Sequence, residues 1–163
     1  YHSMAGKGGN PLAHTLSSSK LDSVFINGQQ TSEFFLHGNI AAKHGVPLVF
    51  VSGDAGLCEE VKDVSPNTTT HATMVGVGDS TINIQPETSK KAIREKVKVT
   101  LSNNLKKCIW AHPDSFSLEV RFINQQLAYR ASHYPGATLL DAKTVSFEAS
   151  DFDNIMRFML FTV

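Results

Sequence analysis

Short apolar segments and longer amphipathic segments follow each other along the whole chain. Segments rich in valine, isoleucine, phenylalanine or threonine predict strands at 24–26, 47–52, 68–77, 117–122, 138–140 and 145–148. Helical patterns run from Glu33 toward Gly45, through 55–64, onward from Pro86, and through 124–132 and 151–163. Because strands and helices alternate, the pattern predicts an α/β fold in which a single layered domain spans residues 1–163.

The longest predicted helix follows Pro86. Its apolar residues recur every four positions, and lysines and glutamates lie between them. This stripe, made of Ile93, Val97, Leu101 and Leu105, is expected to face the core.

Composition narrows the classes of partner. The 163 residues are 41% hydrophobic and 18% charged, and 15 basic side chains balance 15 acidic ones. A neutral surface argues against nucleic acid or an anionic membrane as the main partner. No apolar run approaches the length that spans a membrane. Cys58 and Cys108 lie far apart without a Cys-x-x-Cys neighbour, a usage typical of a reducing cytoplasm.

The first 33 residues hold the densest chemistry in the chain. His2 and His14 lie in a loop-forming run, and Glu33 begins the helix that follows an Asn27-Gly28 turn. Two imidazoles and a carboxylate that a fold brings together can form a zinc site or an acid–base site. The structural alternative is a terminal histidine, a loop histidine and a first-turn glutamate without shared function.

Other candidates have ordinary explanations beside the functional ones. The run Gly6-Lys7-Gly8-Gly9 lacks the spacing of a phosphate-binding loop, and no predicted strand precedes it. Glu33 and His37 are four residues apart on one helix, a spacing that fits either a shared metal or a surface ion pair. Asp54 follows a buried strand, where α/β proteins often place a site, and it would also cap the next helix.

The sequence resembles the D-aminopeptidases, which are dinuclear zinc metallopeptidases (peptidase family 55). The resemblance rests on Tyr1-His2-Ser3-Met4-Ala5-Gly6, Leu12-Ala13-His14-Thr15, Ile26-Asn27-Gly28, Ser32-Glu33 and Val51-Ser52-Gly53-Asp54. It continues more weakly through Val120-Arg121-Phe122 and Tyr134-Pro135-Gly136 to the C-terminal helix. It therefore implies the later portion of a larger α/β metallopeptidase.

The resemblance also implies roles for single residues. His2 and Glu33 match zinc ligands of the family, and His14 matches a histidine implicated in catalysis. The family's remaining ligands, an Asp-x-Glu pair and another histidine, lie upstream of the motif that opens this chain. The ligand set for two Zn²⁺ ions is therefore expected to be incomplete here, and the N-terminal portion of the family fold is expected to be missing.

Two functions follow from the resemblance. The first is a cytoplasmic, zinc-dependent aminopeptidase that releases N-terminal D-amino acids from short peptides and forms homo-oligomers, present as a partial chain. The alternative is a catalytically inactive subunit or interaction domain that retains the fold. Whether the chain acts as an enzyme stays open between them, and another metal-dependent amidohydrolase on this scaffold is a weaker third reading.

Overall fold

The computed structural model describes all 163 residues, and they form two compact units. Unit 1 comprises Tyr1–Ala13 and Ala41–Ala111, and unit 2 comprises His14–Ile40 and His112–Val163. Both units combine strands and helices, which confirms the predicted α/β class. A single domain over residues 1–163 stays a prediction.

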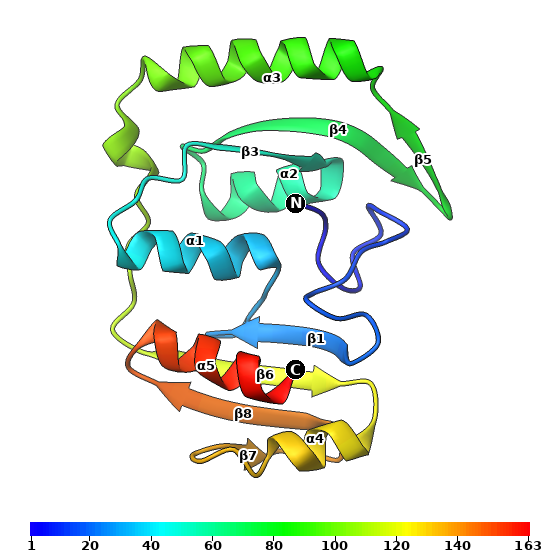
Figure 1. Cartoon of the computed structure of the whole chain (residues 1–163), viewed down its shortest axis with the longest axis vertical. Coiled ribbons are helices and arrows are strands. Elements are labelled where there is room, and N and C mark those ends of the chain that lie inside the picture. The colour runs from blue at the N-terminus through cyan, green and yellow to red at the C-terminus, as the bar shows by residue number, and fades with distance from the viewer. The chain divides into compact units, whose positions relative to one another are not determined.

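The helices and strands follow the predicted order closely (Figure 1). Unit 1 contains β3 (Phe50–Asp54), α2 (Ala55–Val64), β4 (Thr69–Val77), β5 (Ser80–Asn83), α3 (Pro86–Leu101) and the 3-10 helix η1 (Leu105–Cys108). Unit 2 contains β1 (Leu21–Ile26), β2 (Gln29–Gln30), β6 (Phe116–Phe122), α4 (Gln125–Ala131), β7 (Thr138–Leu139), β8 (Thr144–Ala149) and α5 (Phe152–Thr162). Helix α1 (Glu33–Lys43) begins in unit 2, and its last residues are grouped with unit 1.

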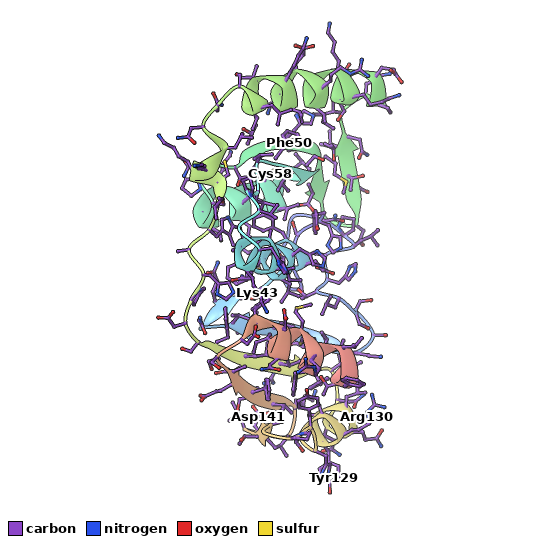
Figure 2. All side chains as sticks on the ribbon, turned by 60° about the vertical axis from the view of Figure 1, so that its left-hand side comes forward. Lys43, Phe50, Cys58, Tyr129, Arg130 and Asp141 are labelled. Carbon is purple, nitrogen blue, oxygen red and sulfur yellow. The ribbon has the colours of Figure 1, made fainter.

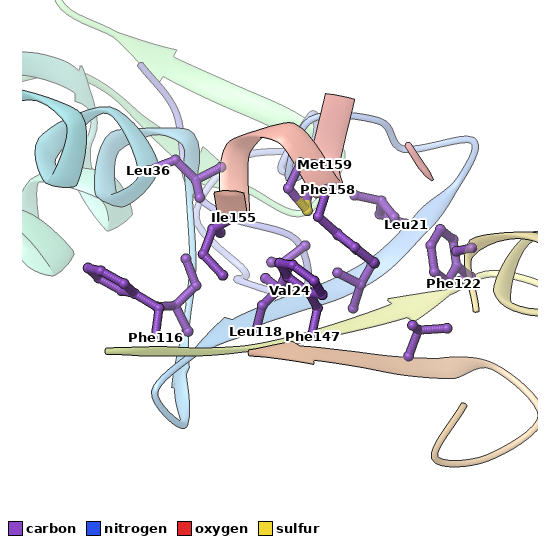
Figure 3. Close-up of a cluster of buried hydrophobic side chains, with 14 of the residues drawn as sticks. Leu21, Val24, Leu36, Phe116, Leu118, Phe122, Phe147, Ile155, Phe158 and Met159 are labelled. Atoms are coloured by element: carbon purple, nitrogen blue, oxygen red, sulfur yellow. The ribbon is translucent and has the colours of Figure 1, made fainter. Parts of the chain in front are cut away.

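Unit 2 is built on a five-stranded antiparallel sheet with the order β2-β1-β6-β8-β7. Along β6 every second residue is buried, from Phe116 to Phe122, so one face of the sheet is apolar. Helix α5 packs Ile155, Phe158 and Met159 onto this face (Figure 3). The ring of Phe158 stacks on that of Phe147, with their centroids 5.0 Å apart. Each such buried side chain contributes about 2 kcal/mol of hydrophobic stabilisation.

The Asn27-Gly28 turn sets where α1 begins. Both residues have positive φ values, 51° and 77°, as a tight turn between antiparallel strands requires. This confirms the predicted turn and adds the short strand β2, which the sequence pattern did not reveal. The side-chain oxygen of Asn27 accepts the Ser117 N–H at 2.7 Å, which ties the turn to β6. Glu33 opens α1 three residues after the end of β2.

Unit 1 is built on a three-stranded sheet with the order β3-β4-β5. β3 and β4 are parallel, and β4 and β5 form an antiparallel hairpin. Figure 1 shows α3 on one side of this sheet and α2 on the other. The strand predicted at 47–52 begins instead at Phe50, because the Leu48 N–H donates to the carbonyl of Cys108.

The prediction that the apolar stripe of α3 faces the core is wrong. Leu101 is exposed, and the buried residues of α3 are Ser89 and Thr100. Hydrogen bonds to side chains of β4 hold this polar face: Ser89 Oγ lies 3.2 Å from His71 Nε2, and Thr100 Oγ1 donates to Thr69 Oγ1 at 2.7 Å. The helix therefore packs through hydrogen bonds, and its apolar stripe is left partly in solvent.

The surface and the cysteines add little chemistry. Tyr129 and Arg130 project outward from α4 (Figure 2). Cys58 and Cys108 are buried free thiols, and burial raises the pKa of Cys58 above its ordinary value, so this thiol is protonated near neutral pH. None of the helices combines the length and the hydrophobicity needed to cross a lipid bilayer.

Candidate metal site

The carboxylate of Glu33 is positioned by the first turn of α1. The hydroxyl of Ser32 accepts the Phe35 N–H at 3.3 Å and so caps the helix. The positive end of the helix dipole favours the negative charge of Glu33. Its two oxygens differ in surroundings: Oε1 accepts the Leu16 N–H at 2.7 Å, whereas Oε2 is buried and has no hydrogen-bond partner.

The loop that carries His14 is fastened to the same helix end. The buried Thr15 hydroxyl donates to the Thr31 carbonyl at 3.0 Å, next to the Leu16–Glu33 hydrogen bond. Leu16 has a φ of 57°, a strained value for a non-glycine residue, which turns its N–H toward the carboxylate. These contacts hold His14 beside Glu33, and their candidate ligand atoms lie within 4.8 Å of each other.

Glu33, with His14 beside it, has the chemistry of part of a metal site. A carboxylate is a good Zn²⁺ ligand, and a neighbouring imidazole can either bind the ion or transfer a proton. A buried carboxylate oxygen without a partner is costly in a folded protein, and a cation removes that cost. The unpartnered Oε2 of Glu33 therefore fits a metal ion at this place. His37, the other candidate on α1, is exposed.

His2 belongs to unit 1, whereas His14 and Glu33 belong to unit 2. It is half-buried, and its Nδ1 lies 3.0 Å from the carbonyl of Ser3. Donation from Nδ1–H to this carbonyl leaves Nε2 as the unprotonated nitrogen, which is the tautomer that binds a metal. The local geometry of His2 is therefore compatible with metal binding through Nε2.

Asp54 fixes the segment that carries His2. Its carboxylate accepts the N–H and the hydroxyl hydrogen of Ser3, the side-chain amide of Asn10 at 3.1 Å, and the Leu57 N–H at 2.9 Å. The last of these bonds caps α2, which confirms the capping role considered for this residue. Asp54 thus connects the N-terminal segment to the junction of β3 and α2, and this positions His2 indirectly.

The glycine-rich run serves close packing within unit 1. The Gly76 N–H donates to the Gly9 carbonyl at 3.0 Å, and a Cβ atom placed on Gly76 would lie 2.5 Å from that oxygen. Only glycine at position 76 permits this backbone approach. The end of the glycine-rich run at Gly9 therefore packs on β4.

Sequence patterns did not reveal the residues that organise this site. Thr15 and Leu16 act through a hydroxyl and a backbone N–H in an irregular loop, where no periodicity marks them. Asn10 offered one signal: asparagine within a glycine-rich loop often forms side-chain hydrogen bonds with the backbone, and here its Oδ1 accepts the Leu12 N–H at 2.9 Å.

Replacement of Asp54 by alanine is expected to lower the free energy of unfolding by about 3 kcal/mol, because it removes a helix cap and leaves buried donors unsatisfied. Asn124→Ala is the matched control, since Asn124 caps α4 through one hydrogen bond to the Leu127 N–H. The control is expected to cost about 1 kcal/mol. Urea denaturation measures both values, and equal losses would reduce Asp54 to an ordinary cap.

The Asp54 carboxylate also makes the free energy of unfolding depend on pH in the acidic range. Burial alone raises the pKa of Asp54, but the hydrogen bonds from Ser3, Leu57 and Asn10 outweigh it and hold the pKa below its ordinary value of 3.8. The stabilisation is therefore complete above that value and is lost as the pH falls through the lower pKa of the folded protein. Asp54→Ala is expected to flatten this part of the stability–pH curve.

Comparison with known proteins places this geometry in a family. Residues 1–161 match the family described as D-aminopeptidase (peptidase family M55). The curated D-aminopeptidase of Bacillus subtilis (strain 168) is 28% identical over 162 residues, which cover 98% of this chain and 58% of that protein.

A solved structure shares the fold. It is described as the Zn-dependent D-aminopeptidase DppA from Bacillus subtilis, a self-compartmentalizing protease, and it superposes with a TM-score of 0.91 at 26% identity. The match covers 99% of this chain and 59% of that one, so the chain spans somewhat more than half the length of these relatives. On the match over residues 1–161, this chain belongs to the D-aminopeptidase family.

Proposed function

We propose that the chain forms part of the active site of a zinc-dependent aminopeptidase that releases N-terminal D-amino acids from short peptides. The observation that carries the proposal is the buried, unpartnered Oε2 of Glu33, held within ligand distance of the His14 imidazole. His2 and Glu33 are the proposed metal ligands, and His14 is the proposed catalytic residue. Family membership and the zinc-dependent relative support this assignment.

Each residue has a separate task in this proposal. When bound, zinc supplies a lowered pKa for water and polarisation of the scissile carbonyl. Glu33 offers Oε2 as a ligand while the Leu16 N–H holds Oε1, which fixes the plane of the carboxylate. The His14 imidazole lies beside the Glu33 carboxylate, so it can take a proton at one ring nitrogen and return it to the leaving amine.

The number of ligands favours a site completed by further residues. A zinc ion needs about four ligands, and two ions need more donors than His2 and Glu33 offer. We propose that additional carboxylate and histidine ligands, outside these 163 residues, complete a pair of zinc ions. The second candidate function is a subunit or interaction domain that retains the fold without catalysis.

Assembly and location complete the proposal. The related structure is described as self-compartmentalizing, which supports homo-oligomers of the present protein as well. Two buried cysteines that form no disulfide fit the reducing cytoplasm that the sequence predicts. Short peptides are the proposed substrates.

Enantiomeric dipeptides test the proposed activity against the inactive alternative. We expect the zinc-loaded protein that contains this chain to hydrolyse a D,D-dipeptide at least about tenfold faster than its L,L enantiomer, because a pocket shaped for one configuration misplaces the other. Release of free amino acid is the measurement, and a chelator is expected to abolish it. Absence of hydrolysis of both peptides at full zinc occupancy would favour the inactive subunit.

A further inference from the structure

The β4–β5 hairpin presents an apolar face to solvent. Val75 and Ile82 are cross-strand neighbours, Val77 lies two residues along β4, and Ile84 lies two residues beyond Ile82, so all four share one face. They are 48%, 67%, 55% and 40% exposed, respectively. The Ile84 N–H donates to the Thr73 carbonyl at 3.0 Å, which continues the hairpin past β5. Four neighbouring aliphatic side chains in water are characteristic of an interaction surface.

The outer edge of this hairpin is formed by the short strand β5. β5 is the last strand of its sheet and pairs only with β4. Its sequence from Ser80 to Asn83 contains neither a charged residue nor a proline, which are the residues that natural proteins place on exposed edges. The Ile84 N–H points toward β4, and backbone groups alternate in direction along a strand. The N–H and C=O groups of Thr81 and Asn83 therefore point away from β4. These outward N–H and C=O groups can pair with a strand of another chain.

Charge indicates which partner fits this surface. The apolar face carries no ionisable side chain, so two copies of it can meet without opposing like charges. A second exposed apolar surface of unit 1, the α3 stripe, is flanked by Lys90, Arg94 and Lys98, of which Lys90 pairs with Glu87. Two copies of α3 would bring these cations together, which costs free energy in a symmetric contact. Self-association is therefore favoured at the hairpin and disfavoured at α3.

We propose that the apolar face of the β4–β5 hairpin, with the adjacent edge of β5, is an interface between two copies of this chain. The inference rests on the proposed assembly into homo-oligomers and adds the surface that makes one contact. Packing the two faces together removes Val75, Val77, Ile82 and Ile84 from water, and this burial drives the association.

Three lysine variants test the surface. Ile82→Lys and Val77→Lys place a charge on either strand of the hairpin face. Val99→Lys is the matched control, because Val99 is an aliphatic residue of the same unit with a similar exposure of 64%. Sedimentation velocity over a wide concentration range measures the assembly of each protein, and circular dichroism checks that each remains folded.

We expect the unmodified protein and Val99→Lys to associate alike, and both hairpin variants to raise the dissociation constant at least about tenfold. Association of the hairpin variants at unmodified strength, an equal loss in Val99→Lys, or a monomer at every concentration would overturn the proposal. Zinc content and peptide hydrolysis are measured on the same samples. If the unmodified protein is inactive but the hairpin variants still lose association, the proposed peptidase activity is refuted and the proposed interface stands. If the unmodified protein is active and Ile82→Lys associates as it does, only the proposed interface is refuted.

Discussion

His14→Ala is expected to lower kcat by at least about a hundredfold and to leave the zinc content unchanged. The reason is the position of this imidazole. Thr15 and Leu16 hold its loop against the start of α1, so the ring lies beside the Glu33 carboxylate. A group at that place can transfer a proton to the reacting atoms without binding the metal. Positioned proton transfer is typically worth about a hundred- to ten-thousand-fold in rate.

Steady-state kinetics and elemental analysis of the active protein measure the two halves of this prediction. His44→Ala is a suitable control, because His44 is an exposed histidine that follows α1. We expect the control to retain both activity and zinc. Release of zinc by His14→Ala would make His14 a ligand, and an unchanged kcat would make it a structural residue.

Glu33→Gln is expected to lose zinc and activity together. Glutamine keeps a side-chain oxygen that can accept the Leu16 N–H, so the loop retains its anchor. It removes the negative charge and offers a poorer ligand at the other position, where Oε2 has no protein partner. His2→Ala is expected to lose zinc and activity as well. Both losses of zinc affinity are expected to exceed those caused by replacing residues that hydrogen-bond to metal ligands, which typically cost about 10- to 100-fold in metal affinity.

Local signals in the sequence were sufficient to place Glu33. The Asn27-Gly28 pair predicts a tight turn because both positions need positive φ, and the structure shows both values. Ser32 is a good helix cap, and Glu33 follows it in the first turn. Short-range preferences therefore predicted the strand, the turn and the helix start, and with them one candidate ligand.

Short-range sequence preferences did not predict the contacts between residues that are distant in the sequence. His14 and Glu33 come together because an irregular loop donates a hydroxyl and an amide to the start of α1, and no spacing rule describes that. Asp54 was recognised as a possible cap, but its bonds to Ser3 and Asn10 span more than 40 residues. Sequence order alone does not predict which polar groups a fold buries together.

The apolar periodicity of α3 correctly predicted a helix but wrongly predicted which of its faces is buried. The four-residue spacing of Ile93, Val97 and Leu101 predicted the helix, but its buried face is formed by Ser89 and Thr100. Strand β5 was missed for a related reason, because Ser80–Asn83 contains a single strongly apolar residue, Ile82. In both elements side-chain hydrogen bonds or backbone pairing, and not hydrophobic burial, determine the packing.

Zinc affinity of the chain, measured by competition with a chromophoric chelator, tests the proposed metal site most directly. The unmodified protein, Glu33→Gln and His37→Gln are compared at constant pH; His37 is the control because it is an exposed histidine one turn further along α1. We expect the unmodified chain and His37→Gln to bind zinc weakly and equally, and Glu33→Gln to bind at least about tenfold more weakly. Equal affinity in all three proteins would contradict the assignment of Glu33 as a metal ligand.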